Sequence, residues 1–159
     1  MSDEIIPVSV FTSYAHKDEA LREELDVHLA MVKRDPAVQI WNDRDIQPGA
    51  EWDDSIKSEL NTADIILLLV SPRFLASRYI FEVEIKTALE RHEKKEAIVV
   101  PIILKKCDWE DTEFHKLQAL PRDAFPVVKW DDMDEAFVNV VEGIKKVIEV
   151  VQTRKKNNA

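Results

Sequence analysis

Short apolar runs alternate with amphipathic segments along most of this chain. Five runs have the length and composition of β-strands, at residues 8–11, 38–41, 65–70, 98–104 and 125–128. The third run is apolar at every position, which is typical of a central parallel strand covered by helices on both faces. The fourth and fifth runs contain proline, which removes a backbone donor and favours positions near a sheet edge or irregular strand ends.

Between these runs, apolar residues recur at helical spacing. The three clearest stripes are Leu21, Leu25, Leu29 and Val32; Trp52, Ile56, Leu60 and Ala63; and Phe137, Val141, Ile144, Ile148 and Val151. Ser71 and Pro72 predict the N-cap and first position of a further helix, and residues 112–120 form at most a short one. The alternation predicts an α/β sandwich around a parallel sheet, in which ligands bind beyond the carboxyl ends of the strands.

Size and composition indicate one globular domain. The chain has 159 residues, 45% of them hydrophobic, so we expect a domain over residues 1–152. The polar tail, residues 153–159, is expected to be frayed or to begin a linker. We expect a cytoplasmic protein that does not contact membranes, because there is no signal peptide pattern, no apolar run near the roughly 20 residues of a membrane helix, and only one cysteine, Cys107. A net charge of −9 argues against direct nucleic-acid binding.

Two carboxylates, Glu82 and Glu84, fall in a mostly apolar segment, residues 79–85. On a regular helix Glu84 lies beside Ile80 and Ala88, so its carboxylate borders an apolar stripe. Such a position requires a partner, a proton or a ligand. Glu82 is the rival candidate, because two residues this close in sequence point in different directions and only one can face a cleft.

Two other segments carry polar clusters. Residues 11–18 lead from the first strand into the first helix and could meet a phosphate or ribose through hydroxyls, the helix start and Lys17. These residues alone favour a simpler interpretation, in which Ser13 or His16 caps the helix and Asp18 complements its dipole.

The second cluster is the charged loop at residues 41–52, which has a tryptophan at each end and a Pro48-Gly49 turn. It could cover a cleft, contact a partner or simply connect two elements in solvent.

Several kinds of site do not match the sequence. With two glycines, the chain has neither a dinucleotide-binding glycine fingerprint nor a phosphate-binding P-loop. The four histidines are scattered without the spacing of metal ligands, so no metal is expected. Cys107 has no neighbouring base in the sequence that would make it a nucleophile.

Four blocks together resemble a Toll/interleukin-1 receptor (TIR) domain of the bacterial type. They are Val10-Phe11-Thr12-Ser13-Tyr14 with His16-Lys17-Asp18; Trp41-Asn42-Asp43-Arg44 with Ile46, Pro48-Gly49 and Trp52; Ala63-Asp64 with Leu67 through Pro72; and Ser77-Arg78-Tyr79 with Glu84-Ile85 and Ala88-Leu89. Each block alone is weak, but their order and spacing across residues 8–150 are specific. The resemblance implies a flavodoxin-like three-layer sandwich with a five-stranded parallel sheet in the order 2-1-3-4-5.

The resemblance also implies one of two functions. The first is an NAD+ glycohydrolase or cyclase that releases nicotinamide and ADP-ribose or a cyclic isomer, acts in bacterial immune (anti-phage) signalling, and is activated by self-assembly. The second is a non-catalytic scaffold that binds other TIR domains. Under the first, NAD+ is the substrate and no separate cofactor is needed. Both imply self-association through the loop at 41–52 and a fused or operon-encoded sensor partner.

For the enzyme, the resemblance assigns Glu84 as the catalytic residue. A carboxylate can stabilise the positive charge that develops on the ribose as nicotinamide leaves. The expected substrate-binding residues are Phe11, Ser13, Tyr14, Lys17, Trp41, Asp43, Arg44, Ser77, Tyr79 and Ile80. Several NAD+-cleaving members have an aromatic residue four positions before the glutamate, where this chain has Ile80, so Tyr79 or Phe81 is expected to supply the stacking surface.

Overall fold

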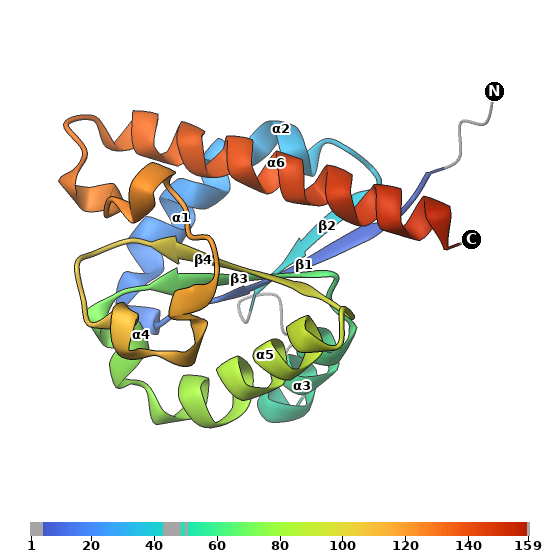
Figure 1. Ribbon diagram of the computed structural model, residues 1–159, viewed down its shortest axis with the longest axis horizontal. Helices are drawn as coiled ribbons and strands as arrows, with labels where there is room; N and C mark the ends of the chain where they lie inside the picture. The colour runs from blue at the N-terminus through green and yellow to red at the C-terminus, as the bar shows by residue number, and fades with distance from the viewer. Residues whose placement is uncertain (1–4, 43–48, 50, 159) are drawn as a thin grey trace.

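A parallel four-stranded sheet forms the centre of the molecule (Figure 1). The computed structural model describes residues 5–42, 49 and 51–158. The strands are β1 (Val8–Ser13), β2 (Val38–Trp41), β3 (Ile65–Val70) and β4 (Ile98–Ile103), in the order β2-β1-β3-β4. The first four predicted strands and their order are therefore confirmed.

Helices cover both faces of the sheet and complete the predicted three-layer sandwich (Figure 1). One face carries α1 (Glu19–His28), α2 (Ala30–Lys33) and α6 (Met133–Asn157). The other carries α3 (Trp52–Thr62), α4 (Pro72–Ala76), the π-helical turn η3 (Ile80–Ile85) and α5 (Lys86–Glu93). Short 3-10 turns complete the connections: η1 (His16–Asp18), η4 (Trp109–Asp111), η5 (Glu113–Lys116), η6 (Arg122–Ala124) and η7 (Val127–Lys129).

The core divides into two layers because strand side chains alternate between the faces. Ile65, Leu67 and Leu69 of β3 pack toward α1 and α6, whereas Ile66, Leu68 and Val70 pack toward α3, α4 and α5. Every residue of β3 is fully buried. This explains why the third run lacks the polar alternation of a half-exposed strand.

The predicted fifth strand, residues 125–128, is absent, and that prediction was wrong. The segment instead forms the turn η7, preceded by Pro126, which has no N–H to donate to a ladder. Leu120 makes an isolated parallel bridge beside β4, in which its carbonyl accepts from the Ile103 N–H at 2.8 Å. The Leu120 N–H also donates to the Pro101 carbonyl at 2.8 Å, so the chain follows the outer edge of β4 through isolated hydrogen bonds without a continuous ladder. The proline-containing β4 therefore lies at the edge of the four-stranded sheet.

Residues 153–157, for which fraying was expected, continue α6 without a break to Asn157. Lys155 ties this helix end to the start of β1, since its ammonium donates to the Pro7 carbonyl at 2.6 Å and to the Asp64 carboxylate at 2.8 Å. Gln152 adds a bond to the Ile6 carbonyl at 3.2 Å. Basic residues in the last turn also complement the helix dipole.

No helix in the described part of the chain has the combination of length and apolarity needed to cross a membrane.

His92, near the end of α5, gives the fold a pH dependence. Its Nδ1 accepts a hydrogen bond from the Val99 N–H at 3.1 Å. Burial, together with the positive charges of Lys116 and Arg154, holds the pKa of His92 below its ordinary value. The imidazole of His92 is therefore protonated more readily in the unfolded chain than in the folded protein. The neutral His92 side chain therefore contributes fully to the free energy of unfolding above its unfolded-state pKa of about 6.5. This contribution is lost as pH falls through the lower pKa of the folded protein.

We expect His92→Asn to flatten this part of the stability profile, because an amide oxygen can accept the same bond but does not titrate. Thermal unfolding of both proteins between about pH 7.5 and pH 5 measures the effect, since that range brackets the ordinary histidine pKa. The wild-type midpoint should fall more than that of the variant. Parallel curves for the two proteins would contradict the assignment.

Candidate active site

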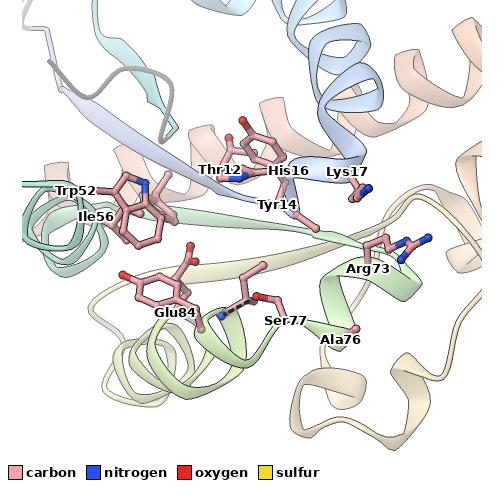
Figure 2. A pocket seen from close by; sticks show the side chains of 14 residues that line it. Thr12, Tyr14, His16, Lys17, Trp52, Ile56, Arg73, Ala76, Ser77 and Glu84 are labelled. Atoms are coloured by element: carbon pink, nitrogen blue, oxygen red, sulfur yellow. Dashed lines mark hydrogen bonds between the residues drawn. The ribbon is translucent and has the colours of Figure 1, made fainter. Parts of the chain in front are cut away.

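A cavity of about 280 Å³ opens at the carboxyl end of β1, between the segment that follows this strand, α3, and the region from α4 to η3 (Figure 2). This is the edge of the sheet at which the sequence predicts a ligand. Three parts of the chain that are distant in sequence therefore form the walls: residues 11–17, 52–56 and 73–84.

Glu84 lies on the wall formed by η3 and is only 7% exposed. Its carboxylate points toward the hollow in Figure 2. A π-helical turn closes hydrogen bonds between residues five apart, which brings Tyr79 as well as Ile80 onto the same wall. Such turns are frequent at functional sites. Burial, a hydrogen bond from Tyr79 to Asp53, and the negative charges of Asp53 and Glu84 together raise the pKa of Tyr79.

The rival carboxylate, Glu82, does not face the cavity. It is exposed, and its carboxylate accepts from the Arg78 guanidinium at 3.2 Å. Neither residue lines the cavity. Among the described residues, Glu84 is thus the carboxylate that lines this hollow.

An aromatic pair stands beside Glu84. The rings of Trp52 and Tyr79 lie 4.8 Å apart between centroids, at an interplanar angle of 45°. The Tyr79 hydroxyl donates to Asp53 at 2.8 Å, and Asp53 also pairs with Lys57 at 2.9 Å. These bonds, with Lys57 as the larger cause, hold the pKa of Asp53 below its ordinary value. Tyr79 is therefore anchored as an aromatic wall, whereas Phe81 lines a separate groove.

The opposite end of the cavity is cationic. Lys17, from η1, and Arg73, from the first turn of α4, both line it. Figure 2 shows them at the end away from Glu84 and Trp52. The cavity can therefore receive a ligand that is cationic at one end and anionic at the other.

A buried hydrogen bond joins the two sides of this cationic end. Asp18 is 2% exposed and accepts from the hydroxyl of Ser71, which is fully buried. Ser71 also accepts from the Phe74 N–H at 3.1 Å, so it is the N-cap of α4 that the sequence predicts. The Lys105 ammonium lies 4.0 Å from the other Asp18 oxygen. Asp18 thereby fixes the segment bearing Lys17 against the helix bearing Arg73.

Most of the predicted substrate-binding residues meet at this cavity. Those that line it with Glu84 are Phe11, Tyr14, Lys17, Ser77, Tyr79 and Ile80. Tyr14 contributes less than expected, because its ring belongs to the core on the α1 face and its hydroxyl donates to Glu19 at 2.7 Å.

Two predicted residues are not among the lining residues. Ser13 is buried at the end of β1, where it is paired with Leu68 inside the sheet. Trp41 stacks on Phe11, with ring centroids 5.4 Å apart. Asp43 and Arg44 lie outside the described residues.

Several lining residues are not among the predicted substrate-binding residues, and Trp52, Ile56 and Arg73 matter most for the chemistry of the cavity. Ile56 was assigned only to the apolar stripe of α3, and Trp52 to that stripe and to the end of the loop at 41–52, although their i, i+4 spacing does place them on one face. Arg73 follows the Ser71-Pro72 helix start, which was the available signal for its position near the end of β3.

Comparisons with known proteins agree with this architecture. The family model described as TIR domain matches residues 10–139. A protein of Sinorhizobium fredii (strain NBRC 101917 / NGR234), named uncharacterized protein y4lF, is 48% identical over 138 residues; the match covers 87% of this chain and 43% of that protein, so the chain spans less than half the length of its relative.

The crystal structure of the TIR domain of the Toll-related receptor TRR-2 from Hydra magnipapillata superposes with a TM-score of 0.59 at 18% identity, covering 87% of this chain and 96% of that one. At this identity the likeness shows the fold. The family model covers most of the chain, and the chain therefore belongs to the TIR domain family.

Proposed function

We propose that this TIR domain cleaves NAD+ at the bond between nicotinamide and ribose. The observation that carries the proposal is the buried Glu84 carboxylate, which lines a cavity beside the rings of Trp52 and Tyr79. The products would be nicotinamide and ADP-ribose or a cyclic isomer of it.

Glu84 would act by electrostatic stabilisation. As the glycosidic bond lengthens, positive charge develops on the ribose, and a carboxylate beside the ring lowers the energy of that state. Nicotinamide leaves from an already cationic pyridinium, so no side chain has to protonate it. The low exposure of Glu84 strengthens the interaction, because little water screens it. Water, or the adenine of the same NAD+ molecule, would then form the new bond to the anomeric carbon.

The rest of the cavity suits the remainder of this substrate. Trp52 and Tyr79 offer ring faces to the nicotinamide, and Lys17 and Arg73 offer positive charge to the pyrophosphate. The volume of about 280 Å³ is at the lower end of the range for ligand sites, about 300–1,000 Å³. It would enclose the nicotinamide ribose half, with the adenosine half extending across the rim.

A second copy of the domain would complete the site. The loop at 41–52 begins where β2 ends and returns to the cavity at Trp52, which is 44% exposed. We propose that assembly through this loop, in the cytoplasm and in response to a sensor partner, activates the enzyme in bacterial immune signalling.

The test is nicotinamide release from NAD+ measured over a range of protein concentrations. The rate per protein molecule should rise with concentration as copies associate. A rate per molecule that is measurable but independent of concentration would reject assembly while leaving the activity. No release at any concentration would reject the activity.

A scaffold without catalysis is the second candidate. Gly49 supports a role of this loop in assembly, because it has a φ of +89°, and a Cβ at this position would meet none of the described atoms within 4 Å, as expected of a shaped and accessible turn. Under this function Gly49→Val would abolish self-association in sedimentation experiments, through backbone strain and without a core clash, while no NAD+ is consumed by either protein.

A further inference from the structure

A second hollow lies on the α5 side of the molecule and shares no lining residue with the NAD+ cavity. Its volume is about 690 Å³, and it runs between α5 and the turns η4 and η5. Leu75, Phe81, Ile85 and Leu89 provide an apolar floor. A groove of this kind can receive the apolar face of a helix from another protein.

The edges of this groove are strongly acidic. Glu90, Glu93, Asp108, Asp111 and Glu113 line it and are exposed, against a single lysine, Lys86. Glu93 pairs with Lys116 at 3.6 Å, whereas the other four carboxylates form no ion pair with the described residues. Like charges gathered around an apolar surface repel one another in the free protein, and a cationic partner would remove that repulsion.

We propose that this groove binds a cationic amphipathic helix of a partner protein, with apolar side chains on the floor and Lys or Arg side chains against the acidic edges. The acidic edges disfavour the other occupants. An anionic membrane surface would be repelled by the acidic edges. A second copy of this chain carries a net charge of −9, so it would also be repelled on approach. The proposal does not depend on NAD+ cleavage.

Three synthetic peptides of equal length test the proposal by fluorescence anisotropy. One is an amphipathic Leu/Lys helix, the second has Glu in place of Lys, and the third scrambles the first so that no apolar face forms. We expect the Leu/Lys helix to bind, more weakly as salt is added, and the other two not to bind. Binding of the scrambled peptide with equal affinity, or no binding of the Leu/Lys helix, would overturn the proposal.

A pair of charge-reversal variants locates the contact. Glu90→Lys with Asp111→Lys changes the groove, and Glu135→Lys with Glu142→Lys makes the same change of net charge on the exposed side of α6. The groove variant should weaken binding about ten-fold or more, and the α6 variant about two-fold or less, since only contacts at the interface are lost directly. Equal weakening in both would show attraction to the net charge alone and would also overturn the proposal.

Discussion

Replacing Glu84 with Gln is expected to reduce nicotinamide release by about a hundred-fold or more. The amide has nearly the same shape as the carboxylate but no charge, so it cannot stabilise a ribosyl cation. Removal of one preorganised electrostatic group from an active site costs about 10²–10³ in rate. The variant and the wild type should be compared at the same high protein concentration, with the circular dichroism melting curve of each recorded to show that the fold is retained.

Glu82→Gln is the matched control for this experiment. It makes the same chemical change two residues away, at an exposed side chain that pairs with Arg78 and does not line the cavity. Its activity should equal that of the wild type within about two-fold, as expected for an exposed pair of small energetic value. Equal rates of NAD+ cleavage by Glu84→Gln and the wild type would show that Glu84 takes no part in the reaction.

Replacing Asp18 with Ala is expected to lower the free energy of unfolding by about 2–4 kcal/mol. The Ser71 hydroxyl would lose its buried acceptor, and a buried polar group left without a partner costs about 1–3 kcal/mol, with more lost when the bond is to a charged group. The cavity left by the missing carboxyl adds to this loss. The shift of the urea unfolding midpoint measures the effect.

A double-mutant cycle separates this bond from other effects. If Asp18 acts through Ser71, the loss in the Asp18→Ala, Ser71→Ala double variant should be smaller than the sum of the single losses by about 1 kcal/mol or more. Glu23→Ala on α1 provides the control, because its side chain is 65% exposed and should change stability by less than about 0.5 kcal/mol. Additive losses from Asp18 and Ser71 would show that the two act separately.

The strands were predictable because burial on both faces leaves a continuous apolar pattern, as in β3. The fifth predicted strand failed for a reason that apolar pattern does not report. Residues 125–128 are apolar enough for a strand, but Pro126 lacks a backbone N–H donor. The backbone of this region makes only isolated hydrogen bonds to β4 and to the residue after it. A strand requires a repeated ladder as well as apolar side chains.

Two candidate carboxylates were predictable from local sequence, but their surroundings were not. Acids in an apolar segment pointed to Glu82 and Glu84, and the resemblance to TIR domains favoured Glu84, which regular helical spacing placed beside Ile80. The π-helical turn then moved Tyr79 onto the same wall, and a change in hydrogen-bond register of this kind has no clear sequence signal.

The contacts that assemble the rest of the site are distant in sequence. Trp52 meets Tyr79, and Asp18 meets Ser71, only after the sheet has brought their loops to one edge. A single sequence does not specify such pairs, because each partner also satisfies a local role, Trp52 in an apolar stripe and Ser71 as a helix cap.

The hydrogen bonds from the end of α6 to Ile6 and Pro7 hold the two ends of the described chain close together (Figure 1). They lie where β1 begins, whereas the cavity opens where β1 ends. A fluorescent protein or surface tether attached at either terminus would therefore stand clear of the cavity mouth. The same proximity makes the domain suitable for circular permutation, with a short linker between the present ends and new termini in an exposed turn such as residues 94–95.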